Sequence, residues 1–153
     1  MMKKTSLRIS ALSLALLLLL AAVFPVFAVS ESVVDDSANV FTAEQRSELK
    51  SRFDRTADKT GWQMIVYTSS QGIGSNLKDY YNANYYDTHS YDADAVVLVY
   101  DVGSNKGTVI THGEAMNYIS DQRMSSLGQM LRGYMDEQNY YQGAVAFADR
   151  IDQ

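Results

Sequence analysis

The sequence predicts an α/β protein, a three-layer α/β/α sandwich on a mixed sheet. Segments with the pattern of helices alternate with segments with the pattern of strands, and there are enough helices to cover both faces of a sheet. The segment Ala95–Tyr100 is continuously apolar, as a strand buried on both faces is. A second strand follows after a short turn, and so short a connection predicts an antiparallel hairpin.

The first 28 residues have the zones of a secretion signal. Lys3, Lys4 and Arg8 form a positive start, Ile9–Phe24 is almost wholly apolar, and Val26–Ala28 offers a cleavage site. The alternative is an uncleaved N-terminal anchor, since an apolar run of about 18 residues can span a bilayer. In both cases we expect the rest of the chain to be secreted or to lie on the extracytoplasmic face of the cell membrane.

Cleavage would leave 125 residues and change the net charge from −5 to −8. That length suits one domain, which we place at residues 33–151. An acidic surface argues against nucleic acid as a partner and against attraction to anionic lipid. The chain has no cysteine, which excludes disulfides and thiolate metal sites.

The first half of the domain contains clear start and stop signals. Thr42 and Gln45 form a capping box that starts a helix, and Gly61 ends it. A strand of residues rich in β-formers follows, and then a segment with helical spacing. The expected elements are a helix over 43–59, a strand over 62–68 and a helix over 76–86.

The second half continues from the central strand. Residues 101–107 form the turn of the hairpin, and Thr108–Thr111 is its second strand. Apolar stripes then predict a long helix that begins after Gly113 and a last helix over 140–151. The ordinary role of both stripes is to pack against the core.

Candidate chemistry is restricted to carboxylates, because the metal, nucleotide and nucleophile motifs that we looked for do not occur. In an antiparallel hairpin, Asp94 at the start of the first strand should lie close to Thr111–Gly113 at the end of the second. Asp121 would follow about two turns along the next helix. If Asp36 enters from the same edge, the three carboxylates converge on one rim and suit Ca²⁺ or Mg²⁺.

Simpler interpretations stand beside this one. Asp35, Asp92 and Glu114 have the positions of capping or solvated residues. His112 is either a general acid, a phosphate contact or a hydrogen-bonded turn residue. The many tyrosines of residues 80–91 are typical of amphipathic cover, with the ring inside and the hydroxyl at the surface.

Short motifs in a characteristic order resemble a known family. They are Asp36–Thr42, Thr60–Gln63, Asp94 before the apolar strand, Thr111–Gly113, Ser120-Asp121 and Asn139–Gly143. In this order they resemble the TPM domain, which is also described as thylakoid-lumen acid phosphatase-like. The likeness extends from about Val33 to Ile151, with Ala95 where glycine is usual in the family.

The resemblance implies an α/β/α fold, export or attachment to a membrane, and a Ca²⁺-type site near the acidic positions. By position it selects Asp36, Asp94 and Asp121 as metal ligands. It implies phosphatase activity in some members and roles in the assembly or repair of membrane complexes in others.

Two functions follow for this chain. The first is a divalent-cation-binding interaction module that meets an envelope or membrane protein, with the membrane itself reached only through an uncleaved N-terminal segment. The second is a metal-assisted phosphomonoesterase, in which a bound cation polarises phosphate and activates water. Several unneutralised carboxylates would repel phosphate, which favours the binding module.

Overall fold

The computed structural model describes residues 31–89 and 91–153. The expected secretion signal lies outside the described residues. The sheet, its two hydrophobic cores and the helices that cover them all lie within residues 33–151. The described helices and strands are therefore built around this one sheet.

The described residues form a four-stranded mixed sheet in the order β1-β2-β3-β4. The strands are β1 (Val33–Asp36), β2 (Gln63–Ser69), β3 (Ala95–Asp101) and β4 (Lys106–His112). The first three are parallel, and β4 is antiparallel to β3 with Ala95 opposite His112. The expected hairpin and mixed sheet are confirmed, while β1 is a strand that the sequence pattern did not predict.

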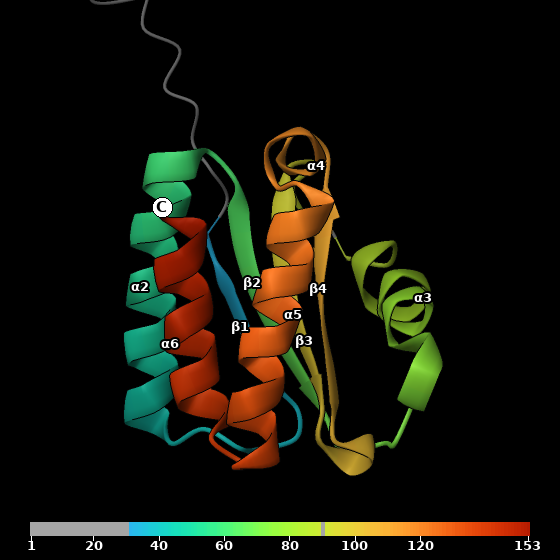
Figure 1. Cartoon of the computed structure of the whole chain (residues 1–153). Coiled ribbons are helices and arrows are strands. Elements are labelled where there is room, and N and C mark those ends of the chain that lie inside the picture. The colour runs from blue at the N-terminus through green and yellow to red at the C-terminus, as the bar shows by residue number, and fades with distance from the viewer. Residues whose placement is uncertain (1–30, 90) are drawn as a thin grey trace, which may run out of the picture.

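Helices cover the two faces of the sheet unequally, as Figure 1 shows. On one face α2, α6 and α5 lie side by side, and on the other lies α3, which continues into a single π-helical turn. The bounds are α2 (Ala43–Thr60), α3 (Leu77–Tyr81), the π turn (Asn82–Tyr86), α4 (Ala115–Tyr118), α5 (Asp121–Asp136) and α6 (Tyr140–Ile151). The predicted α/β/α sandwich is therefore confirmed.

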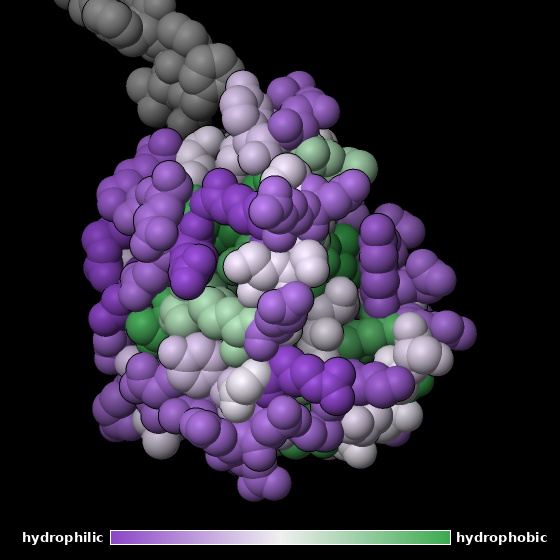
Figure 2. All heavy atoms as spheres, viewed as in Figure 1, coloured by the Kyte–Doolittle hydropathy of each residue, from purple (hydrophilic) through white to green (hydrophobic). Residues whose placement is uncertain are grey.

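Alternation along the buried strands builds two cores. Met64 and Val66 of β2 face the three-helix layer, whereas Ile65 and Tyr67 face α3. Residues of β3 divide in the same way, which is why this strand is apolar at nearly every position. The face that Figure 2 shows is mostly hydrophilic, and hydrophobic residues appear there mainly in recesses between hydrophilic ones.

The local signals of α2 act as expected. The Thr42 hydroxyl accepts from Gln45 N–H, and the Gln45 side chain accepts from Thr42 N–H, at 3.2 and 2.9 Å. Gly61 ends the helix in the left-handed conformation, with φ 77°. Both ends of α2 are therefore fixed by hydrogen bonds between residues of the helix and the residues directly next to it.

The expectation of one long helix after Gly113 is wrong. The chain forms the single turn α4, becomes extended at Ile119, and starts again at α5 with Ser120 as N-cap. The Ser120 hydroxyl accepts from Arg123 N–H at 3.3 Å, so a cap signal divides the apolar stripe into two helices. Among the described residues no helix is both long enough and apolar enough to cross a bilayer.

Candidate functional site

The sequence-predicted carboxylates lie at both ends of the sheet. Asp36 is the last residue of β1 and is in register with Thr68 and, across β2, with Tyr100. Asp94 precedes the first residue of β3, six positions before Tyr100, which separates the two along the strand direction by about 20 Å. The expectation that Asp36 and Asp94 share one rim is therefore wrong, because β1 and β3 are parallel and the two residues flank opposite ends.

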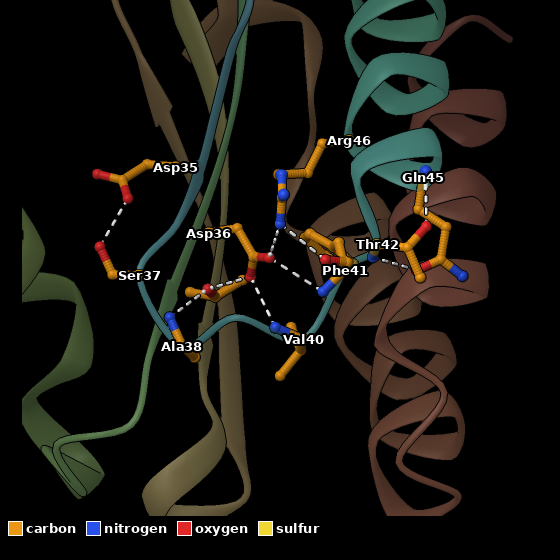
Figure 3. Close-up of polar contacts among 10 residues, drawn as sticks. Asp35, Asp36, Ser37, Ala38, Val40, Phe41, Thr42, Gln45 and Arg46 are labelled. Carbon is orange, nitrogen blue, oxygen red and sulfur yellow. Dashed lines mark hydrogen bonds and ion pairs between the residues drawn. The ribbon is translucent and has the colours of Figure 1, made fainter.

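Asp36 is enclosed by hydrogen-bond donors, as Figure 3 shows. Its Oδ1 accepts from Val40 N–H and the Thr68 hydroxyl, at 3.0 and 2.9 Å. Its Oδ2 accepts from Phe41 N–H and the Arg46 guanidinium, at 3.0 and 3.1 Å. The side chain is only 2% exposed. A carboxylate has about four acceptor positions, so this one is fully engaged in holding the loop before α2 and has no position left for a cation.

Asp94 lies where the hairpin argument expected it. Its Oδ1 accepts from Glu114 N–H at 2.7 Å, and its main-chain carbonyl accepts from Gln63 N–H at 2.9 Å. Gly113 has φ 58°, and a Cβ there would lie 2.0 Å from Asp94 Oδ1 and 2.4 Å from the carbonyl oxygen of Ala93. Both oxygens therefore lie close against Gly113, where any larger side chain would displace them.

Asp121 is exposed in the first turn of α5. Because α4 and α5 are separate helices, Asp121 is not two turns along the axis that begins at Gly113. A carboxylate in the first turn of a helix is stabilised by the helix dipole. Its position is sufficiently explained by that interaction.

The end of the sheet that carries Asp94 also exposes large apolar side chains. Met116 and Tyr118 of α4 are 62% and 68% exposed, and they are the large hydrophobic residues that the described chain leaves most open. The ring of Tyr118 contacts that of Trp62, with centroids 5.7 Å apart. We call Asp94, Glu114, Met116, Tyr118 and Trp62 the Asp94 surface.

His112 ends β4 beside this surface. Its ring stacks on Tyr86 with centroids 3.6 Å apart and an interplanar angle of 6°. Its Nε2 is buried and has no hydrogen-bond partner among the described residues. Burial and, to a smaller extent, the positive charge of Lys78 lower the pKa of His112, although Asp87 acts in the opposite direction. The ring is therefore neutral at neutral pH, which does not suit a general acid.

A carboxylate that the sequence analysis assigned only to a turn lies at the far end of the sheet. Asp101, the last residue of β3, is fully buried. It accepts from Gly72 N–H at 3.0 Å, Gly74 N–H at 2.9 Å and the Ser104 hydroxyl. Burial opposes its ionisation, but these hydrogen bonds outweigh burial and lower its pKa. An acid directly after an apolar strand was the available sequence signal.

The acidic residues do not form a ready-made cage. Among residues 31–89 and 91–153 no three His, Asp or Glu side chains are grouped so that they would hold a metal ion. An ion at Asp94 would need main-chain oxygens, water or a partner to complete its ligands.

Several solved structures have a similar fold. The structure is similar to the solution structure of the N-terminal domain of a P. gingivalis protein, with a TM-score of 0.63 and 17% identity over 80% of this chain and 83% of that one. It is also similar to the N-terminal domain of the cg2496 protein from Corynebacterium glutamicum, with a TM-score of 0.60 and 10% identity over 84% and 82% of the two chains.

A third similar structure is the BA42 protein from the psychrophilic bacterium Bizionia argentinensis, with a TM-score of 0.59 and 13% identity over 73% of this chain and 79% of that one. These likenesses show the fold. No curated protein sequence matches the chain significantly. The sequence model of the TPM domain, however, matches residues 34–153, which is nearly the whole of the folded part. The chain therefore belongs to the TPM domain family.

Proposed function

We propose that this TPM domain is an extracytoplasmic interaction module that docks an envelope or membrane protein through the Asp94 surface. The observation that carries the proposal is the exposure of Met116 and Tyr118 directly beside the carboxylates of Asp94 and Glu114. Exposed apolar side chains with a polar rim are typical of protein–protein contact sites. Tyr118 is the kind of aromatic residue that anchors such contacts.

A divalent cation of the Ca²⁺ type is the proposed link between the domain and its partner. Of the two carboxylate oxygens of Asp94, only Oδ1 has a hydrogen-bond partner among the described residues, and the Ala93 carbonyl oxygen lies against Gly113 beside it. Ca²⁺ binds such carboxylate and carbonyl oxygens and accepts water or further carboxylates as its remaining ligands. A partner that supplied these would bind only when the ion is present.

The alternative, a phosphomonoesterase, has less support from the same geometry. In such an enzyme, cationic side chains beside the reacting carboxylates help a bound metal ion to hold the phosphate. Arg123 instead donates to the carbonyl oxygens of Arg150 and Ile151 at the end of α6. Lys106 is in register with Asp101, at the opposite end of the sheet from Asp94.

Calcium titration of residues 29–153 tests the cation. Chelator-treated protein should gain thermal stability with added CaCl₂, by about 2.7 kcal/mol at a hundredfold excess over Kd, or roughly 10 °C in Tm. Asp94→Asn should abolish the gain. The matched control is Asp58→Asn, which removes one exposed carboxylate from α2 and should leave the gain intact. A wild type that shows no shift, or an equal loss in the control, would refute the cation site.

Photo-crosslinking tests the docking surface. A photoreactive phenylalanine analogue in place of Tyr118 should crosslink to one protein of an envelope extract, and only with Ca²⁺ present. The same analogue at Arg55, exposed on α2, should not. Equal crosslinking from both positions would refute the surface. Hydrolysis of p-nitrophenyl phosphate that Asp94→Asn abolishes would establish the enzyme instead.

A further inference from the structure

A groove at the end of the sheet opposite to Asp94 is lined by three cationic side chains. It has a volume of about 620 Å³ and lies between the start of α3, the β3–β4 hairpin and the second half of α5. Lys78, Lys106 and Arg132 line it, one from each of these three elements. All three are exposed. Residues far apart in the chain thus place three positive charges around one depression.

These charges are not neutralised by the protein. Among the described residues that line the groove there is no Asp or Glu. None of the three cations forms an ion pair with another described residue. The chain as a whole has a net charge of −5. A cationic groove on an acidic protein attracts anions to this place and repels them elsewhere.

The polar walls of the groove are held in position by the buried Asp101. This carboxylate accepts from Gly74 N–H and the Ser104 hydroxyl, and both of these residues line the groove. Its negative charge is therefore already engaged by hydrogen-bond donors in the interior of the protein. The hydroxyl of Thr108 and the side chain of Asn105 add neutral hydrogen-bonding groups to the lining.

At the floor of the groove, Met135 and Tyr100 pack closely against the backbone of Gly107. A Cβ at Gly107 would lie 2.7 Å from Met135 Sδ and 3.2 Å from the Tyr100 ring. β4 is also the edge strand, so its outer side has main-chain groups without a strand partner in the described part of the chain. Because residues 106–108 of β4 line the groove, its main-chain groups add hydrogen-bonding positions for a ligand.

We propose that this groove binds a small-molecule anion with two or more phosphate or carboxylate groups. The volume is within the range of small-ligand sites, about 300–1,000 Å³. Three cations on three sides match a ligand with several negative groups better than a single inorganic anion. Guanidinium and ammonium groups bind phosphate and carboxylate oxygens by charge-assisted hydrogen bonds. The site is separate from the Asp94 surface and needs no metal.

Calorimetric titration of residues 29–153 with sodium pyrophosphate and with citrate, at low ionic strength and with chelator present, tests the site. We expect saturable binding of one anion per chain, weakened about tenfold by Lys106→Gln or by Arg132→Gln. The matched control Arg55→Gln removes one exposed cation from α2 and should leave the affinity unchanged. Asp94→Asn should also have no effect, which separates this site from the proposed cation site.

Amide NMR shifts give a second measurement that does not depend on the variants. Gly74, Gly107 and Gly128 line the groove, and their N–H signals should move with either anion. The tighter of the two probes then identifies the ligand as a phosphate or a carboxylate compound. The proposal is overturned if neither anion binds saturably, if Arg55→Gln weakens binding as much as Arg132→Gln, or if the shifts lie outside the groove.

Discussion

Replacement of Asp36 by Asn tests whether this carboxylate stabilises the fold or serves as a metal ligand. The amide can place its oxygen where Oδ2 accepts from Phe41 N–H and Arg46. Its NH₂ group then faces Val40 N–H, which loses its partner, and the Thr68 hydroxyl, which can turn and accept. One buried N–H without a partner costs about 1–3 kcal/mol, and the loss of charge from the remaining bonds adds to it. We expect a total loss of about 3 kcal/mol.

Urea unfolding measures this loss, with the fluorescence of Trp62 and circular dichroism as probes. The matched control is Asp35→Asn, which removes the same charge from the neighbouring residue, whose partly exposed carboxylate accepts from the Ser37 hydroxyl. Its stability should change by no more than about 0.5 kcal/mol. The loss in Asp36→Asn should be equal with chelator and with Ca²⁺. A loss below about 1 kcal/mol, or one seen only with Ca²⁺, would refute the structural role.

Two further predictions concern other buried contacts. Gly143→Ala places a Cβ 2.4 Å from the Tyr100 hydroxyl, so the free energy of unfolding should fall by about 1–3 kcal/mol. Removal of that hydroxyl by Tyr100→Phe should restore most of the loss. If Gly143→Ala costs as much in the Tyr100→Phe background as in the wild type, the contact is contradicted. Asp101 has a lowered pKa, so its ionised form stabilises the fold above pH about 4 and this contribution is lost as the pH falls below 3.8. Asp101→Asn should therefore be less stable at neutral pH and lose less in acid, and acid titration curves that run parallel to the wild type would contradict this.

The sequence was sufficient for most of the fold because its signals are local. The capping box at Thr42, the glycine at position 61 and the turn of the hairpin each form with residues a few positions away. Asp94 was correctly placed beside Gly113, because an antiparallel pair connected by a short turn has a fixed geometry. The apolar stripe after Gly113 led to the wrong prediction of one continuous helix, because the N-cap of α5 is a single residue, Ser120, within that stripe.

The placement of Asp36 failed because it depends on the direction of a strand that was not recognised. β1 has four residues, two of them acidic, and shows no clear apolar alternation. Once β1 is known, α2 between β1 and β2 implies a parallel pair, and an acid at the end of β1 must then lie at the opposite end of the sheet from an acid before β3. The role of Asp101 was hidden for a similar reason, because two of its donors, Gly72 and Gly74, come from a loop about thirty residues earlier.

The segment between β2 and β3 is attached to the sheet at both of its ends. Asp101 holds its beginning through Gly72 and Gly74, and the Gln63 side chain accepts from Asp92 N–H near its end. Both attachments belong to strand residues, so they do not depend on what lies between them. Evolution or protein engineering can therefore exchange the intervening cover, which includes α3, while the four strands keep their order. A grafted loop of similar span would find its two points of attachment already in place.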